Sequence, residues 1–237
     1  MNQTDQNGLK QGHWIKNYPN GSRMYDGIFR DGHPAGEFKR YYENGILKSV
    51  MVFSDNGRES DAVLYYPDGS IASRGKYIDQ KKDGKWQFYS PAIRDYLVCE
   101  QYFVNDLRNG ISVGFYPDGK IGDKTTYEKD QKNGLREQFY EDGSSYTRSN
   151  YKNGKLNGLF EAWFPGGKKM YTGTYKNDLR DGTWMIYNED GSIRYKIEYK
   201  DGAPDNRQMD DDASNYLNTL EKQKGKIPDP EKTGEMW

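Results

Sequence analysis

The chain repeats itself every 24 residues, and this period limits what it can fold into more than any other feature. Eight repeats begin at a glycine or, once, at a serine, in steps of 24 residues with one step of 26: Gly12, Gly36, Ser60, Gly84, Gly110, Gly134, Gly158 and Gly182. An aromatic residue follows seventeen positions later in each repeat, or nineteen in the fourth, which carries two extra residues: Phe29, Phe53, Tyr77, Phe103, Tyr127, Tyr151, Tyr175 and Tyr199. Chance does not place eight aromatic residues in register, so we expect a tandem array of one structural unit.

Two sets of turn-forming residues divide each repeat. The first set consists of Asn-Gly or Asp-Gly pairs: Asn20-Gly21, Asn44-Gly45, Asp68-Gly69, Asp118-Gly119, Asp142-Gly143 and Asp190-Gly191. These pairs favour type I′ hairpin turns, in which both central residues have positive φ. A second set follows about eleven residues later, as at Asp31-Gly32 and Asn153-Gly154. The runs between turns, roughly six to nine residues long, have the length of strands rather than helices.

The composition indicates how these strands can pack. Only 33% of the residues are hydrophobic and 30% are charged, whereas 15% are aromatic, so Tyr, Trp and Phe must supply most of the buried apolar surface. We therefore predict an all-β fold: an elongated antiparallel β-meander of about sixteen strands. We expect a single-layer or curved sheet, partly solvated on each face, with a short C-terminal helix. A sandwich or a closed barrel is the alternative, although either would need more aliphatic residues.

The period also predicts which residues face each other. A two-residue first turn pairs Gly12 with Phe29 and Trp14 with Gly27, so large rings are expected to cover glycines across the strands. A row of cations recurs five residues after the repeated aromatic residue: Arg58, Lys82, Arg108, Lys132 and Arg180. In the register of the second turn these cations lie opposite that ring, which predicts cation–π contacts.

Three segments follow from this pattern. Residues 1–11 form a short lead-in, residues 12–205 form the eight repeats, and residues 206–237 form a capping helix and a loose tail. The acidic run Asp210–Asp212 is typical of a helix N-terminus, and Lys224 with Gly225 is typical of its C-terminus. An apolar stripe follows the helical period: Ala213, Tyr216, Leu217 and Leu220. We expect this helix to cap the exposed last strand.

The repeat resembles a known family. The segments that carry the resemblance are Gly36-Glu37-Phe38-Lys39-Arg40-Tyr41-Tyr42-Glu43-Asn44-Gly45 and Gly173-Thr174-Tyr175-Lys176-Asn177. They resemble the MORN-like repeat, in particular the 24-residue variant of bacterial proteins named YwqK-type antitoxins. The resemblance spans Gly12 to about Asp205, and departs from the family at Ser60 and at the missing first turn of the fourth repeat. It implies hairpin repeats in a non-enzymatic scaffold, and a toxin as the protein partner.

The sequence offers no catalytic, cofactor-binding or metal-binding residues that we would assign. Gly110–Gly114 matches the Gly-x-Ser-x-Gly pattern of hydrolases, but Ser112 falls on a strand position and no helix follows it. Both histidines, His13 and His33, precede that serine, and Cys99 is the only cysteine. The formal net charge of −1 excludes a nucleic-acid footprint and disfavours membrane binding. We therefore expect a protein that is not an enzyme and needs no cofactor.

The surface that remains is a row of aromatic residues five positions after the repeat starts. Strand alternation places this row on the face opposite the repeated aromatic residue: Tyr41, Tyr65, Tyr89, Phe115, Phe139, Trp163 and Tyr187. We predict that it binds a protein partner, with a glycan-binding or structural role in the cell envelope as the alternative. A third interpretation is that the rings only hold the sheet together. The polar start Met1–Asp5 is not a signal peptide, so a cytoplasmic protein and an exported periplasmic or cell-envelope protein both remain open.

Overall fold

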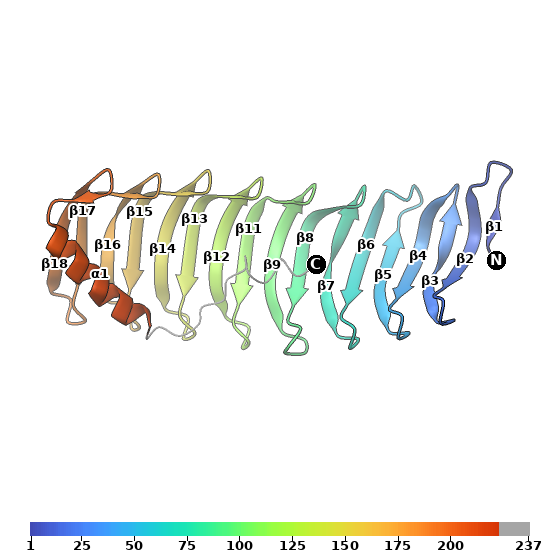
Figure 1. Ribbon diagram of the computed structural model, residues 1–237, viewed down its shortest axis with the longest axis horizontal. Coiled ribbons are helices and arrows are strands. Elements are labelled where there is room, and N and C mark those ends of the chain that lie inside the picture. Colours follow the sequence, from blue (N-terminus) through green and yellow to red (C-terminus); the bar gives the residue numbers. More distant parts are fainter. Residues whose placement is uncertain (223–237) are drawn as a thin grey trace. The chain divides into compact units, whose positions relative to one another are not determined.

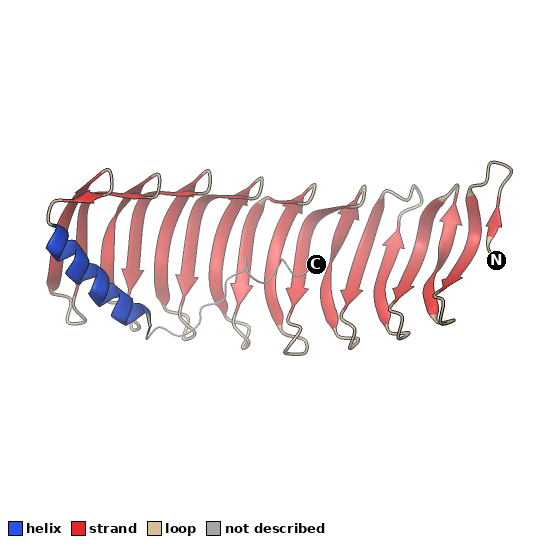
Figure 2. Cartoon of the chain, viewed as in Figure 1, coloured by secondary structure: helices blue, strands red, loops and turns tan. Residues whose placement is uncertain are grey.

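The computed structural model describes residues 1–222 as an antiparallel β-meander with one C-terminal helix, which confirms the predicted fold class. The chain divides into two compact units, Met1–Leu107 and the residues from Arg108 onward. Strands and tight turns alternate along both units, and the helix follows the last strands (Figure 2). Sixteen strands have six to nine residues, the number expected from eight hairpins, and three further strands have two residues each.

Each strand pairs antiparallel with the next one along the chain within a unit. The N-terminal unit contains β1 (Gln3–Thr4), β2 (Lys10–Asn17), β3 (Arg23–Arg30), β4 (His33–Tyr41), β5 (Leu47–Phe53), β6 (Glu59–Tyr65), β7 (Ile71–Ile78), β8 (Lys81–Tyr89) and β9 (Leu97–Val104). The division between the units falls within β10 (Leu107–Arg108). The C-terminal unit contains β11 (Gly110–Phe115), β12 (Ile121–Glu128), β13 (Gln131–Phe139), β14 (Ser145–Lys152), β15 (Lys155–Trp163), β16 (Lys169–Lys176), β17 (Leu179–Tyr187), β18 (Ile193–Lys200), β19 (Ala203–Pro204) and the helix α1 (Arg207–Glu221).

The first turns have the predicted register but not the predicted turn type. Gly12 pairs with Phe29 and Trp14 with Gly27, as the two-residue arithmetic requires. Gly21 has a φ of +87°, but Asn20 has no positive φ, so the turn is not type I′. It is a longer turn closed by hydrogen bonds between Tyr18 and Ser22 and between Gly21 and Tyr18, with a β-bulge that restores the register. Asparagine is favoured here because its side-chain oxygen accepts a hydrogen bond from the Ser22 backbone N–H at 2.9 Å.

The second turns are the ones with type I′ geometry. Asp31 and Gly32 both have positive φ, 50° and 79°, and Arg30 pairs directly with His33. Asn177 and Asp178 have φ values of 51° and 70°, so the geometry does not require glycine. Asn and Asp tolerate this left-handed conformation better than other non-glycine residues, which explains their recurrence at these positions.

Five of the seven repeat-starting glycines occupy β-bulges, which corrects the expectation that a ring covers them: Gly36, Gly84, Gly134, Gly158 and Gly182. In the pairing of β7 with β8 the register shifts between Arg74 and Lys76, and Gly84 in the bulged segment has a φ of +69°. A Cβ added at Gly84 would meet nothing within 4 Å. The glycine is therefore required by backbone conformation rather than by packing. Each bulge bends its strand, and the curved strands are visible in Figure 1.

Ser60 can replace glycine because its strand has no β-bulge, and the extra residue of this repeat lies in the preceding turn instead. The pairing of β5 with β6 has one constant register from Ser49 to Ser60, without a bulge. The connecting turn is longer instead and contains Gly57 with a φ of +68°. The repeat keeps its length of 24 residues, and Ser60 adopts ordinary strand geometry.

One face of the sheet is a buried core, whereas the sequence suggested partial solvation on both. This inner face carries the repeated aromatic residue and the side chain two positions after each repeat start. In the N-terminal unit the buried cluster comprises Ala62, Trp86, Phe88, Cys99 and Phe103. Trp86 and Cys99 have no exposed surface. The opposite side, the outer face, retains exposed aliphatic and charged residues.

Three strand glycines do lie beneath rings, but the ring comes from the following repeat. A Cβ on Gly75 would lie 2.4 Å from a Trp86 ring carbon, and a Cβ on Gly173 would lie 2.1 Å from one of Trp184. Gly27 has the same relation to Phe38. The aromatic cover of glycine therefore joins successive hairpins, rather than the two strands of one hairpin.

The helix α1 packs on the inner face rather than on the edge of the last strand. Figure 1 shows it crossing the strands of the last repeats. Ala213 is fully buried against Trp184, Ile186 and Ile197, and Leu217 also joins a second cluster around Ala162. The helix begins earlier than the acidic run suggested, because the side chain of Asn206 caps it by accepting from the Met209 backbone N–H at 3.0 Å. The strand edge of β18 is paired instead with β19, which ends in Pro204. The expected loose tail and the predicted helix end at Lys224 and Gly225 lie outside the described residues.

Candidate functional site

The predicted aromatic row lies near the first turns and is only partly exposed. Every member has intermediate burial: Tyr41, Tyr65, Tyr89, Phe115, Phe139, Trp163 and Tyr187. Some of the rings are held by neighbouring cations: the Arg74 guanidinium carbon lies 5.6 Å from the Tyr89 ring centre, and the Lys124 Nζ lies 5.9 Å from that of Phe139. The rings of the row are thus partly exposed and partly packed against the sheet.

A second row, of exposed aliphatic residues, was missed by the sequence argument. These residues stand one position after the repeat starts in three consecutive repeats of the C-terminal unit: Ile111 (52% exposed), Leu135 (37%) and Leu159 (48%). Alternation along β13 puts Leu135, Glu137 and Phe139 on the same side. The aliphatic row and the aromatic row therefore share the outer face. The signal was available as isoleucine or leucine directly after a repeat-starting glycine.

Ion pairs run between these two rows. Arg148 Nη2 lies 2.9 Å from Glu137 Oε1, and Lys169 Nζ lies 2.7 Å from Glu161 Oε1. Both ion pairs bridge neighbouring strands on the outer face, and within each pair the cation neutralises the carboxylate. The outer face of the C-terminal unit thus has an aliphatic band, a charged band and an aromatic band, all repeated with the period of the sequence.

The inner face carries a ladder of tyrosines that the sequence argument also missed. In five repeats a tyrosine six positions after the repeat start donates its hydroxyl to the backbone carbonyl of the aromatic-row member in the following repeat. These hydrogen bonds have lengths of 2.7–2.9 Å: Tyr18 to Tyr41, Tyr42 to Tyr65, Tyr66 to Tyr89, Tyr116 to Phe139 and Tyr140 to Trp163. The Tyr-Tyr and Phe-Tyr pairs of the sequence were its signal. One ring of each pair faces outward, and the other ties successive repeats together.

The predicted cation row makes cation–π contacts, but with the repeated aromatic residue of the following repeat rather than with the ring five residues earlier. The Arg108 guanidinium lies 4.4 Å from the Tyr127 ring centre, and Lys132 Nζ lies 5.2 Å from that of Tyr151. Arg58 forms two hydrogen bonds with Asp79 at 2.8 and 2.6 Å, and Arg108 binds Asp130 at 2.6 Å in addition to its ring contact. The cations therefore stabilise the inner-face ring clusters.

A buried ion pair lies on the inner face of the fifth and sixth repeats. Asp123 is fully buried, and its Oδ2 lies 2.8 Å from Arg136 Nε, while Thr125 donates to its other oxygen at 2.6 Å. Burial lowers the pKa of Arg136, but the carboxylate of Asp123 outweighs it and holds that pKa above its ordinary value. Arg136 replaces the aromatic residue of other repeats, so this pair substitutes a polar core for a ring.

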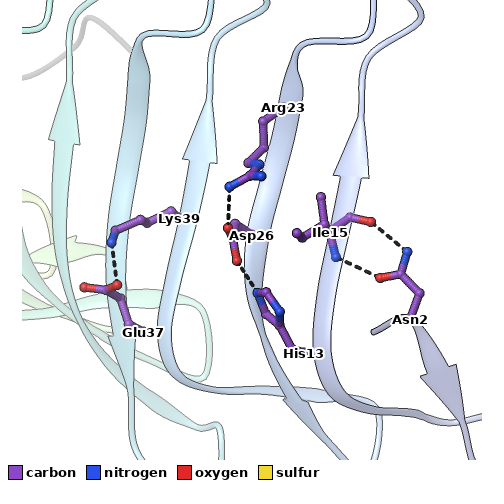
Figure 3. A network of polar contacts seen from close by, with 7 residues as sticks. All are labelled: Asn2, His13, Ile15, Arg23, Asp26, Glu37 and Lys39. Carbon is purple, nitrogen blue, oxygen red and sulfur yellow. Dashed lines mark hydrogen bonds and ion pairs between the residues drawn. The ribbon is translucent and has the colours of Figure 1, made fainter.

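The residues that could suggest catalysis are either ion-paired or buried, and the buried Ser112 hydroxyl has no hydrogen-bond partner in the part of the chain that the structure describes. His13 Nε2 lies 2.5 Å from Asp26 Oδ1, and Arg23 binds the other oxygen of that carboxylate at 2.7 Å (Figure 3). Ser112 and Cys99 are buried in the inner face. Within residues 1–222 no group of three or more His, Cys, Asp or Glu side chains could hold a metal ion. In that same range the helix is neither long nor apolar enough to cross a membrane.

Four segments of the chain match the family model described as MORN repeat variant: residues 35–55, 132–153, 156–177 and 180–201. Each segment covers the two strands joined by a first turn, and together they span less than half of the chain. No curated protein matches the chain. The resemblance to the MORN repeat is therefore confirmed for four of the eight repeats, whereas the resemblance to antitoxins still rests on the sequence pattern.

Proposed function

We propose that this protein is a non-enzymatic repeat scaffold that binds a protein partner along the outer face of its C-terminal unit. The observation that carries the proposal is the exposure of Ile111, Leu135 and Leu159 in three consecutive repeats. Equivalent residues of adjacent repeats stand two strands apart, about 10 Å at ordinary strand spacing. Regularly spaced apolar side chains beside a charged band are the composition of a protein-binding surface.

The aromatic row extends this surface. Phe115, Phe139 and Trp163 lie on the same strands as the three aliphatic residues and face the same side. Aromatic residues that are already partly ordered lose little conformational entropy on binding, which favours them as anchors. Under the antitoxin resemblance the partner would be a toxin.

The test is a pull-down with the purified protein as bait, comparing one triple variant with a matched control. Ile111→Ser, Leu135→Ser and Leu159→Ser together should abolish capture of the specific partner, because they remove the aliphatic band without touching the inner face. Ile28→Ser and Val52→Ser change equally exposed aliphatic residues of the N-terminal unit and should leave capture intact. Equal capture by the triple variant, or competition by oligosaccharides instead, would contradict the proposal and favour the glycan-binding alternative.

A further inference from the structure

A cavity opens on the inner face of the N-terminal unit where the repeat loses a ring. Two residues after the repeat starts, five repeats carry a large aromatic residue: Trp14, Phe38, Trp86, Phe160 and Trp184. The third repeat has Ala62 at this position. A cavity of about 450 Å³ lies among strands β4 to β7; Ala62 does not line it, but Met51, its partner on β5, and Ser60 and Leu64, on either side of it along β6, do. This volume is within the usual range of sites for small organic molecules.

The floor of the cavity is apolar. Met51, Phe53, Leu64 and Tyr77 line it, and each of these side chains is half-buried. Met51, Leu64 and Tyr77 also pack against the buried cluster that contains Trp86, so the floor is supported from the adjoining repeat. An apolar group that entered the cavity would be removed from water without displacing any part of the core.

The rim of the cavity is cationic. Arg40, Lys48 and Arg58 line it, and all three side chains are exposed, whereas no Asp or Glu lies among the lining residues. Arg58 is engaged by Asp79. Within residues 1–222 neither Arg40 nor Lys48 forms an ion pair; they lie 5.9 Å and 5.3 Å from the ring centres of Phe38 and Tyr42.

These two cations stand at positions that are uncharged in most other repeats; the exceptions are Lys16 in the first repeat, equivalent to Arg40, and Arg194 in the eighth, equivalent to Lys48. The positions equivalent to Arg40 hold Leu64, Phe88 and Ile186 in other repeats. The positions equivalent to Lys48 hold Ala72, Val98 and Met170, which are buried in the core. The missing ring and the added charges therefore occur in adjacent repeats and meet at one cavity.

We propose that this cavity binds a small organic anion, namely a carboxylate carried on an apolar body. The apolar body would fill the space left by the missing ring, and Arg40 would pair with the carboxylate through its planar guanidinium, with Lys48 adding a second positive charge. An inorganic anion would leave the apolar floor unused, and a neutral apolar molecule would leave the two cations without a partner. The site lies on the inner face of the other unit, so it is independent of the proposed protein-binding surface.

The test uses 4-phenylbutyrate as the probe, titrated into the full-length protein and followed by isothermal calorimetry and by protein NMR. We expect saturable binding with a Kd of about 1 mM or tighter, and chemical-shift changes confined to the lining residues. 4-Phenylbutan-1-ol, which has the same ring without the charge, and inorganic phosphate should each bind at least about tenfold more weakly. A short peptide ending in phenylalanine, free or amidated at its C-terminus, distinguishes a peptide carboxylate from a free small acid as the source of the ligand.

Two variants keep the proposal falsifiable. Arg40→Gln with Lys48→Gln should weaken phenylbutyrate binding about tenfold or more without changing the circular dichroism spectrum, because both side chains are exposed. Ala62→Phe should fill the cavity and abolish binding. Lys39→Gln with Lys85→Gln removes two cations of the same unit that lie outside the cavity and should leave the affinity unchanged. Unaltered binding to the Arg40/Lys48 double variant, or no saturable binding to the native protein, would overturn the proposal.

Discussion

Glycine residues with the same periodicity meet two different requirements in this chain. Gly182 begins a repeat with a φ of +71°, and a Cβ there would meet nothing within 4 Å. Gly173 has no positive φ, but a Cβ there would overlap the Trp184 ring at 2.1 Å. The first position needs backbone freedom and the second needs space. A substitution should therefore destabilise the protein by different mechanisms at the two sites.

We expect Gly173→Ala to lower the free energy of unfolding by about 1–3 kcal/mol, because the added methyl group forces Trp184 out of its buried position. Gly182→Asn should cost less, since Asn tolerates the left-handed region. Urea unfolding of both variants, followed by tryptophan fluorescence, provides the measurement. A Gly173→Ala protein as stable as the native one would show that the ring can move without cost.

The tyrosine ladder makes stability depend on pH in the alkaline range. Burial raises the pKa of Tyr140 to about 12, with a further contribution from the carboxylates of Glu221 and Asp142. An unfolded tyrosine titrates near pH 10. Because the folded pKa is the higher one, the stability that Tyr140 contributes is complete below about pH 10 and is lost as the pH rises towards 12.

Tyr140→Phe should therefore destabilise the protein most at neutral pH. The variant loses the hydrogen bond to the Trp163 carbonyl, and we expect a loss of about 1 kcal/mol at pH 8. The difference in unfolding free energy between variant and native protein should shrink as the pH rises above 10. Above that pH the unfolded native chain loses the Tyr140 proton while the folded state keeps it, which destabilises the native protein but not the variant. Urea unfolding at several pH values measures it. A difference that grows with pH would mean that the sign of this linkage is wrong.

At the scale of the element, α1 is held by both apolar and polar contacts. Ala213 and Leu217 pack on the inner-face clusters. Asp210 in the first turn accepts hydrogen bonds from Tyr199 at 2.5 Å and from Arg180 at 3.1 Å. The hydrogen bond from Tyr199 to Asp210 and the burial of its ring raise the pKa of Tyr199 to about 12, with burial the larger cause. The acidic run thus has one member that anchors the helix to the sheet.

Removal of the helix should expose the core of the last repeats. A protein truncated after Asp205 loses the cover over Ile186 and Ile197, both nearly fully buried in the native chain. We expect it to bind the dye ANS and to self-associate, as measured by fluorescence and by analytical ultracentrifugation. Asn206→Ala removes only the N-cap and should cost about 1 kcal/mol without dye binding. A monomeric truncated protein that binds no ANS would indicate that the helix is dispensable as a cover.

At the scale of the whole molecule, stability in a repeat array is a sum of local terms. Each hairpin contacts its neighbours along the chain, and the described residues form two compact units. Trp86 and Trp184 are each nearly fully buried, one in each unit. In such arrays a cavity in one repeat destabilises mainly its own unit and the adjoining repeats.

We expect Trp86→Ala to accelerate amide hydrogen exchange in strands β7–β9 and to leave β15–β18 unchanged. Trp184→Ala should have the reverse pattern. Each substitution should cost about 3–5 kcal/mol locally, as for large buried aromatic residues elsewhere. Hydrogen exchange read by mass spectrometry resolves the two regions. Uniform acceleration over the whole chain in either variant would show that the array unfolds as one cooperative unit.

The sequence by itself determined the repeat, the all-β class and the strand register. A fixed period makes pairing a matter of arithmetic, so Gly12 opposite Phe29 and Gly182 opposite Tyr199 could be stated in advance. The candidate aromatic row followed from the same period, and its role in binding stays a prediction. Strand alternation is a property of the local backbone, and it does not depend on what the strands later pack against.

Only the tertiary structure decided how the sheet is curved and what its two faces are. β-Bulges at glycines such as Gly84 bend the strands, and this bend closes one face into a core that the low aliphatic content had argued against. It also placed α1 on that face rather than on the edge, exposed the outer row of Ile111, Leu135 and Leu159, and left a cavity beside Ala62. Curvature accumulates from small backbone deviations in every repeat, and burial depends on that sum. A pattern of residue types records which side chains share a face, but not how far that face closes.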